Sequence, residues 1–311
     1  MLPSFTIQIA HLRITVGSEA NHSVLLEEWR QLFRYHIVAD EARVLHRMVL
    51  CPSRAFAMPE EVMPQWSFPC LGVSASHSRH RSFWKRLFSR GIKRPMYSGS
   101  GIVDCYRDTQ GKDYLVPEQN DWRIVHDANE HTTYVYADKH NDGLVATLLH
   151  VIGSQYGCYL LFASCVAQKG EAILLTGKGG AGKTTRCLEL VQQGATYMGD
   201  DLVLVYHQGR QMMVGALLLP IKQDTGGKQK ERKDILSDTS QILLNAPLTA
   251  IYWLQESYKN NPNPQIAPIP KDAVMEKILL LTNTVHLHAD RMHFMETIST
   301  LCEEVPAYYY Q

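Results

Sequence analysis

Long apolar runs are absent from the sequence. No stretch approaches the roughly 18 consecutive apolar residues that a membrane-spanning helix needs, and the longest candidate, Tyr159–Ala167, has the length of a strand. The N-terminus also lacks a basic head followed by an apolar run, which is the pattern of a secretory signal. We therefore expect a cytoplasmic protein without a membrane span.

Paired cysteines and an excess of one charge are also absent. The seven cysteines include no Cys-x-x-Cys pair and are spaced irregularly, so we expect reduced, packed thiols. Basic and acidic residues balance at 31 each, which argues against a general nucleic-acid binder. Hydrophobic residues make up 45% of the 311 positions, enough for a sizeable core in about two domains. The oligomeric state is left open, and a homo-oligomer is compatible with the sequence.

The first half of the sequence mixes strand and helix patterns. Apolar residues at every second position over 5–9 and 12–16 indicate strands, and a helical spacing follows from Leu25 to Phe33. Short apolar runs separated by turn residues over 102–137 predict an antiparallel meander. We therefore expect a mixed α+β domain over residues 1–140, which ends before a helical stripe at 144–152.

The second half has the pattern of an α/β domain over residues 141–311. The expected elements are strands at 159–166, 172–176, 196–198, 202–206, 212–219 and 249–254, and helices at 186–191, 272–281 and 289–302. The chain closes on Val305-Pro306-Ala307-Tyr308. We expect this strand at a sheet edge because proline has no N–H to donate.

The clearest motif is a glycine-rich loop between a buried strand and a helix. It matches G-x-x-x-x-G-K-[ST] in full and consists of Gly177, Lys178, Gly179, Gly180, Ala181, Gly182, Lys183, Thr184 and Thr185. Backbone N–H groups in such a loop can surround phosphate oxygens, and the helix that starts at Lys183 points its positive end at them. We expect Lys183 to reach the β- and γ-phosphates of ATP and the Thr184 hydroxyl to bind Mg²⁺. The alternative is a glycine-rich turn without a ligand.

Two adjacent carboxylates follow the next strand. Asp200 and Asp201 lie 17 and 18 positions after Lys183. If that strand ends beside the phosphates, the carboxylates can hold Mg²⁺ and accept the proton of an attacking hydroxyl. A solvated turn after a strand explains the same residues equally well from spacing alone.

The run Ala172–Asp201 resembles the catalytic core of HPr serine kinase/phosphorylase and the broader HPr-kinase-like proteins. That family has a glycine-rich loop ending in Gly-Lys-[Ser/Thr], a leucine-rich helix, a glycine, and a strand ending in Asp-Asp. The matching residues here are Gly182-Lys183-Thr184, the helix that precedes Gly194, and Gly199-Asp200-Asp201. The closing Val305–Tyr308 is similar to the end of many such chains.

The resemblance implies a P-loop kinase domain of the HPr-kinase/PEP-carboxykinase type. By it, Asp201 is the proton acceptor from a substrate serine, Asp200 lies beside it, and Lys183 neutralises the transferring phosphoryl group. ATP and Mg²⁺ would be required, with Thr184 and Asp200 as the metal contacts. The expected activity is therefore an ATP-dependent serine kinase.

The sequence departs from the family pattern at two places. Bifunctional members carry a histidine 15 residues before the first glycine of the loop, where this chain has Phe162. They also carry a metal-binding glutamate downstream, for which no equivalent is found around Gly226. The missing histidine makes phosphorylase activity unexpected.

The N-terminal half is more similar to kinase-like proteins encoded with ribosomal peptides such as lasso peptides. Those proteins phosphorylate a serine of a precursor peptide. The resemblance therefore implies a peptide or small-protein acceptor, recognised with the help of residues 1–140.

A rival interpretation of the loop is the deviant signature of ParA- and MinD-like ATPases. In those proteins the early lysine, here Lys178, reaches the nucleotide of a partner subunit. They place the loop after their first strand, whereas about 175 residues precede it here. This difference argues against the rival, and we interpret Lys178 as a solvated loop lysine. A nucleotide-gated binding module that hydrolyses ATP slowly stays the alternative function.

Three further patterns are less specific. The segment Arg79–Arg94 is basic with interleaved aromatics and could bind an acidic peptide or membrane surface, or be a solvated helix face. A second basic run, Lys228–Lys233, is expected to be a loop. His286, His288 and His293 lack a cysteine or carboxylate that would complete a metal site.

Overall fold

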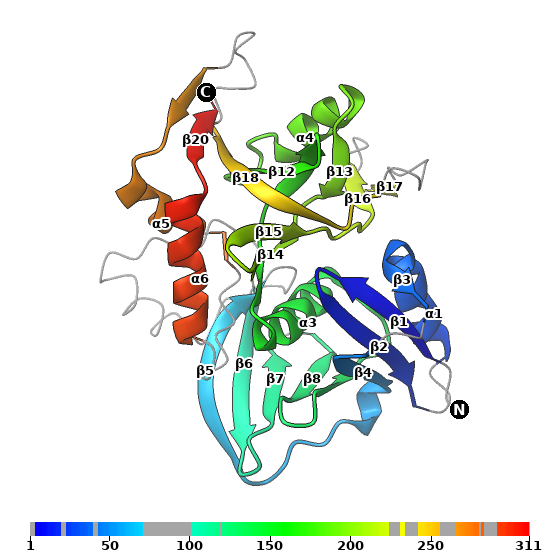
Figure 1. Cartoon of the computed structure of the whole chain (residues 1–311). Helices are drawn as coiled ribbons and strands as arrows, with labels where there is room; N and C mark the ends of the chain where they lie inside the picture. The colour runs from blue at the N-terminus through cyan, green and yellow to red at the C-terminus, as the bar shows by residue number, and fades with distance from the viewer. Residues whose placement is uncertain are drawn as a thin grey trace.

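Two large β-sheets and the helices packed on them make up the fold (Figure 1). The structure is a computed structural model and describes residues 4–19, 23–39, 43–70, 101–118, 120–223, 231–233, 242–255, 265–279, 281–282 and 291–310. Each of the two sheets has nine strands, and a short hairpin of β16 (Ile221–Gln223) and β17 (Glu231–Lys233) stands apart. The expected mixed α/β class is confirmed.

The first sheet is built from the N-terminal half of the chain. Its strands, in spatial order, are β3 (Ile37–Val38), β1 (Ser4–Ile9), β2 (Leu12–Ser18), β4 (His46–Cys51), β9 (Thr132–Tyr136), β8 (Arg123–Asp127), β7 (Asp113–Pro117), β6 (Gly101–Asp108) and β5 (Val62–Cys70). Strands β5 to β9 pair consecutively and antiparallel, which is the meander that the turn residues predict. Strand β4 is parallel to both of its neighbours.

The second sheet carries the glycine-rich loop. Its strands, in spatial order, are β10 (Cys158–Leu161), β14 (Val203–Gln208), β15 (Gln211–Gly215), β18 (Asn245–Leu254), β12 (Glu171–Gly177), β11 (Ser164–Gln168) and β13 (Thr196–Gly199). Strand β20 (Ala307–Tyr310) pairs with β18, and β19 (Ile266–Pro268) pairs with β20. The parallel strands β12, β18 and β20 end at the same edge of the sheet.

Helices cover the sheets according to their apolar stripes. The described helices are α1 (Ser23–Leu32), α3 (Asp142–Gln155), α4 (Lys183–Gln192), α5 (Lys271–Leu279) and α6 (Arg291–Glu304). Helix α1 buries Leu25, Leu26, Trp29 and Leu32 against the first sheet, the residues whose spacing predicts it. Its other face is polar, as expected for a helix on the surface of a sheet.

Helix α3 lies where the two halves of the chain meet (Figure 1). It is buried along most of its length, and its N-cap Asn141 accepts a hydrogen bond from the Leu144 N–H at 2.9 Å. One hydrophobic cluster joins this helix to the first sheet and also includes Leu160 and Leu204 of the second sheet. The core is therefore continuous across residue 140, and the predicted domain division at that position stays a prediction.

A buried histidine also ties the two sheets together. His36 Nδ1 lies 3.0 Å from the carbonyl oxygen of Gln8 on β1, and the Leu218 N–H donates to His36 Nε2 at 3.1 Å. Leu218 follows Leu217, which forms a parallel bridge with Gly199 at the end of β13. The N-terminal sheet is thus hydrogen-bonded to the segment beside the paired aspartates.

Two expectations about strands are wrong. The single strand expected over 159–166 is two strands, because the Phe162 N–H donates to the Leu281 carbonyl at 2.9 Å instead of to a sheet neighbour. The closing strand β20 is not at an edge, since β18 and β19 flank it on both sides. Pro306 lies just before the paired residues, so its missing N–H costs the sheet nothing.

The described thiols are packed inside the fold, as their irregular spacing predicts. Side chains are described for six of the seven cysteines, and all six are free and buried. None of the helices among the described residues is both long and apolar enough to cross a membrane.

Candidate functional site

The glycine-rich loop connects β12 to α4, as the sequence predicts. Gly177, Gly180 and Gly182 have φ angles of 140°, 79° and 94°, which only glycine adopts readily. A side chain at Gly177 would place its Cβ 2.5 Å from the carbonyl oxygen of Leu254. Gly179 and Gly180 are exposed, and a Cβ added to either would meet no atom within 4 Å. The middle of the loop is therefore open to solvent just before the N-terminus of α4.

Lys183, the first residue of α4, points back into this loop. Its side chain is only 7% exposed, and its ammonium donates to the carbonyl oxygens of Gly177 and Lys178, each at 3.2 Å. Burial lowers the pKa of Lys183, while the negative charges of Asp201 and Asp200 act in the opposite direction. The site thus holds a partly desolvated cation beside two carboxylates.

The ring of Phe162 covers the same ammonium. The distance from Lys183 Nζ to the centre of the Phe162 ring is 5.1 Å, which is a cation–π contact. Phe162 lies between β10 and β11 and is half-buried. Phe162, which stands where the resemblance leads us to expect a histidine in bifunctional kinases, therefore lies at the site and supplies no titratable group there.

Asp200 joins the end of β13 to both α4 and β11. The Thr184 hydroxyl donates to Asp200 Oδ2 at 2.9 Å, and the Ser164 hydroxyl donates to Asp200 Oδ1. Strand β11 lies between β12 and β13, so the strand that ends in the aspartates is not the direct neighbour of the loop strand. Because β11 is antiparallel to both, β12 and β13 still end at the same edge.

Asp201 occupies the turn that follows. Its φ angle is 66°, in the left-handed region that aspartate tolerates better than most residues. The turn is tight, since a Cβ on Gly199 would lie 3.1 Å from the carbonyl oxygen of Leu217 and 3.2 Å from that of Leu202. This geometry places two successive carboxylates at the sheet edge, where both influence Lys183.

The structure brings most of the predicted site residues together. Lys183, Thr184, Asp200 and Asp201 converge at the ends of β12 and β13. The side chains of Lys178 and Thr185 are exposed, and Ala181 is buried under the loop.

Sequence reasoning missed Ser164. The only signal for it is the antiparallel register of β11 and β13, which pairs Cys165 with Gly199 and so places Ser164 opposite Asp200. Two other buried hydroxyls near the site, Thr176 Oγ1 and Tyr197 Oη, have no hydrogen-bond partner among the described residues. Burial is the main cause that raises the pKa of Tyr197.

Several sequence predictions fall outside the described residues. These are the basic segment Arg79–Arg94, residues 228–230 of the second basic run, and His286 and His288. Residues 231–233 of that run form β17. Among described residues, no group of three or more histidine, cysteine, aspartate or glutamate side chains could hold a metal ion.

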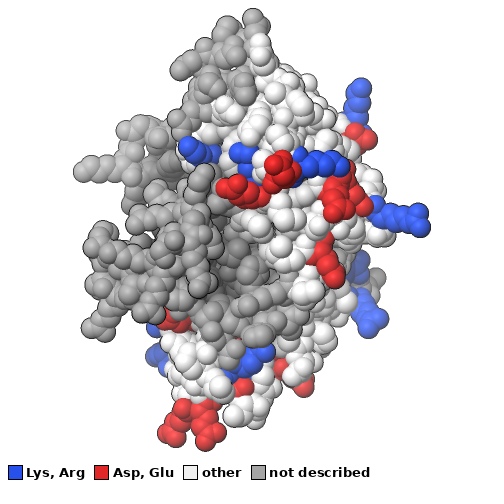
Figure 2. All heavy atoms as spheres, turned by 90° about the vertical axis from the view of Figure 1, so that its left-hand side faces the viewer, with Lys and Arg blue, Asp and Glu red and all other residues white. Residues whose placement is uncertain are grey.

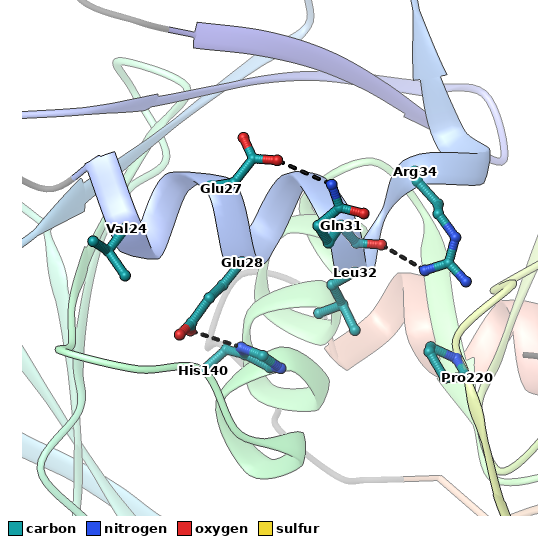
Figure 3. Close-up of a pocket in the computed structure, with 8 residues that line it drawn as sticks. All are labelled: Val24, Glu27, Glu28, Gln31, Leu32, Arg34, His140 and Pro220. Atoms are coloured by element: carbon teal, nitrogen blue, oxygen red, sulfur yellow. Dashed lines mark hydrogen bonds and ion pairs between the residues drawn. The ribbon is translucent and has the colours of Figure 1, made fainter. Parts of the chain in front are cut away.

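A pocket of about 540 Å³ lies between α1 and the segment that leads into β16 (Figure 3). Its lining residues are Val24, Glu27, Glu28, Gln31, Leu32, Arg34, His140 and Pro220. Figure 3 shows the Glu28 carboxylate and the His140 ring pointing toward one another, and they lie 3.1 Å apart. Pro220 comes three residues after Leu217, and Leu217 forms a bridge with Gly199, which directly precedes Asp200. The chain segment that forms this wall of the pocket therefore starts beside the aspartates.

Charges on the face that carries α5 are mixed. Figure 2 shows basic and acidic side chains interspersed over the described part of this face. Helix α5 itself contributes both signs, with Lys271, Asp272, Glu276 and Lys277. On this face the described residues therefore form no broad basic surface, in agreement with the balanced composition.

Parts of the chain are similar to curated proteins that are named HPr kinase/phosphorylase. The chain is 36% identical over 88 residues to the HPr kinase/phosphorylase of Mycoplasmopsis pulmonis, a match that covers 28% of each protein. It is 49% identical over 47 residues to the HPr kinase/phosphorylase of Lacticaseibacillus casei, which is 15% of each. In these segments the chain is similar to HPr kinase/phosphorylases.

The matches span less than a third of the length of these curated relatives. No protein-family model matches the chain. Among solved structures, the HPr(Ser) kinase/phosphatase from Coxiella burnetii aligns with 48% of this chain and 83% of its own, at a TM-score of 0.30 and 14% identity. The expected family resemblance is confirmed, and the similarity to kinases encoded with lasso peptides stays a prediction.

Proposed function

We propose that the chain is an ATP-dependent serine kinase that acts on a peptide or small protein. The observation that carries this proposal is the convergence of Lys183, Thr184 and two carboxylates at one open, glycine-rich edge of the second sheet. The sequence relatives, which are named HPr kinase/phosphorylase, support it. Their similarity to part of this chain supports a kinase over a slow nucleotide-gated switch.

The loop fits a nucleoside triphosphate. Gly179 and Gly180 are exposed, with open space at the Cβ position of each, and the left-handed glycines let the backbone curve around an anion. Lys183 now donates to two carbonyl oxygens of the loop itself. Phosphate oxygens are stronger acceptors for an ammonium than neutral carbonyls are. Lys183 would therefore exchange these contacts for the β- and γ-phosphates.

The oxygens of Thr184 and Asp200 fit Mg²⁺. The ion prefers oxygen ligands at about 2.0–2.1 Å in an octahedron, so adjacent ligand atoms lie about 2.9–3.0 Å apart. Thr184 Oγ1 and Asp200 Oδ2 have this spacing, at 2.9 Å. When bound, Mg²⁺ would neutralise charge on the phosphates. Ser164, which donates to the other oxygen of Asp200, would orient that carboxylate.

We assign to Asp201 the role of accepting the proton of the serine hydroxyl. In the reaction, the serine oxygen bonds to the γ-phosphorus of ATP, the bond from that phosphorus to the β-phosphate oxygen breaks, and the hydroxyl proton passes to the Asp201 carboxylate. Lys183 balances the negative charge of the transferring group. Phe162 covers Lys183 without offering a base for the attack of inorganic phosphate, which supports a kinase without phosphorylase activity.

The acceptor would bind in the pocket between α1 and Pro220. Its wall at Pro220 is continuous with the segment beside Gly199, Asp200 and Asp201. Two glutamates and one arginine line it, so it suits a peptide that carries an apolar side chain and a basic residue near the serine. This assigns acceptor recognition to the N-terminal half, and a ribosomal precursor peptide of the lasso type is the finer proposal.

Matched lysine variants test the nucleotide site. Calorimetric titration with Mg-ATP should show that Lys183→Ala weakens binding at least about tenfold, because a charge-assisted contact to phosphate is lost. Lys178→Ala changes an exposed lysine in the same loop and should bind ATP within about twofold of wild type. Unchanged affinity in Lys183→Ala would overturn the assignment. A selective loss in Lys178→Ala would favour the ParA-like alternative.

A further inference from the structure

Tyr310 lies at the same sheet edge as the glycine-rich loop. Gly177 at the end of β12 pairs with Leu254 of β18, and Leu254 pairs with Tyr310 of β20. Neighbouring strands are about 4.8 Å apart, so the Tyr310 backbone is about 10 Å from the start of the loop. Tyr310 lies on the β18 side of β12, whereas Asp200 and Asp201 lie on the opposite side, after β13.

Arg186, in the first turn of α4, reaches across to this tyrosine. Its guanidinium carbon lies 5.3 Å from the centre of the Tyr310 ring, and its Nη1 is 2.9 Å from Glu189 Oε2. Tyr310 is 8% exposed and meets Tyr252 edge to face at 6.1 Å, so the ring that backs the guanidinium is itself fixed. The Arg186 side chain remains 21% exposed. A planar cation is thus held at the surface beside the loop, with a tyrosine ring behind it.

The orientation of a bound nucleotide follows from the positions of the reacting groups. The phosphate that is transferred must lie near Lys183 and Asp201, on the β13 side of the loop. A phosphate chain that crossed the loop from there would place the sugar and base on the other side, above β18 and β20. Arg186 is three residues after Lys183 on the same helix and lies on that side.

We propose that the solvent-facing side of the Arg186 guanidinium, backed by Tyr310, stacks on the base of the bound nucleotide. The inference rests on the proposed function, because it takes the triphosphate to occupy the loop. Guanidinium planes stack on both aromatic rings and bases, so Arg186 would lie between Tyr310 and the base. Stacking reads the face of a base and not its hydrogen-bonding edge. The platform therefore accepts ATP and GTP alike and favours purines over the smaller pyrimidines.

Binding of ATP and of inorganic tripolyphosphate, measured with the full chain and Mg²⁺, tests the platform. Arg186→Lys keeps the positive charge and removes the planar face, so it should weaken ATP about five- to tenfold and leave tripolyphosphate within twofold. The wild-type preference for ATP over CTP should shrink in the same variant. Arg186→Ala should weaken ATP binding further than Arg186→Lys does, and its thermal midpoint should equal that of wild type.

The outcomes separate the platform from the loop. Unchanged ATP affinity in Arg186→Lys, or an equal loss toward ATP and tripolyphosphate, would overturn the platform and leave the nucleotide site standing. A wild-type chain that binds tripolyphosphate and ATP equally well would also overturn it. If the wild-type chain binds neither ligand, the proposed function itself fails.

Discussion

Acidification should destabilise the protein through His36, the buried residue that links the two sheets. The Leu218 N–H donates to His36 Nε2, so this nitrogen must carry no proton in the fold, and Nδ1 then donates to the Gln8 carbonyl. A protonated imidazole would place an N–H against the Leu218 N–H. Burial lowers the pKa of His36 to about 4, opposed by the hydrogen bond to Gln8.

The size of the effect follows from the difference between the two states. An unfolded histidine has a pKa of about 6.5 and takes up a proton below it, whereas the folded His36 stays neutral until the pH nears 4. The contribution of His36 to stability is therefore complete above pH 6.5 and is lost as the pH falls from 6.5 toward 4. At pH 5.0 the loss is about 2 kcal/mol, from 1.5 pH units at about 1.36 kcal/mol each.

Urea unfolding of wild type and His36→Gln at pH 7.5 and 5.0 measures this. The variant should be less stable at pH 7.5, because two hydrogen bonds worth about 1 kcal/mol each are disturbed. Its further loss on going to pH 5.0 should be smaller than that of wild type by about 2 kcal/mol. Other buried histidines, such as His46 and His126, are present in both proteins and cancel in the comparison.

His207→Gln provides the matched control. The His207 side chain is 33% exposed, and its Nε2 lies 3.9 Å from Glu304 Oε2. This variant should keep the wild-type pH dependence within about 0.5 kcal/mol. If wild type and His36→Gln lose the same free energy of unfolding between the two pH values, His36 does not stay neutral in the fold, and the reasoning is refuted.

Three further predictions concern the proposed kinase site. Asp200→Asn should raise the Mg²⁺ concentration needed for half-maximal transfer by about tenfold, because an anionic carboxylate is replaced by a neutral amide that keeps only one of the two oxygens to which Thr184 and Ser164 donate. An unchanged Mg²⁺ requirement would remove Asp200 from the metal site. Incubation of phosphorylated product with inorganic phosphate should release negligible label, because Phe162 offers no base, and rapid phosphate-dependent release would contradict that. Val24→Arg, which adds bulk to a 73% exposed position on the pocket wall, should raise KM for the acceptor several-fold and leave KM for ATP unchanged; equal changes would argue against the pocket.

The local structure of the site could be predicted from sequence because the chemistry of the loop is local. Gly177, Gly180 and Gly182 stand where the backbone needs left-handed φ angles, and the strand and helix on either side follow from their apolar spacing. For Asp200 and Asp201 the spacing alone left a phosphate site and a solvated turn open. The hydrogen bond from Thr184 to Asp200 and the effect of both charges on Lys183 agree with the former.

Features that depend on strand order could not be predicted in this way. Ser164 reaches Asp200 only because β11 is inserted between β12 and β13, and nothing in the spacing of residues specifies that order. The division of 159–166 into two strands depends on a hydrogen bond from Phe162 to Leu281, more than a hundred residues away. The partnership of Arg186 and Tyr310 likewise requires the parallel pairing of β20 with β18.

Transfer of labelled phosphate from [γ-³²P]ATP to an arrayed library of serine-centred peptides tests the central claim most directly. The wild-type chain should label peptides that carry a basic residue near the serine. Asp201→Asn should reduce the rate by about 10²-fold, at the lower end for general-base catalysis, with ATP affinity kept within a few-fold. Near-full transfer by Asp201→Asn, or wild-type label that appears only as free phosphate, would contradict the account.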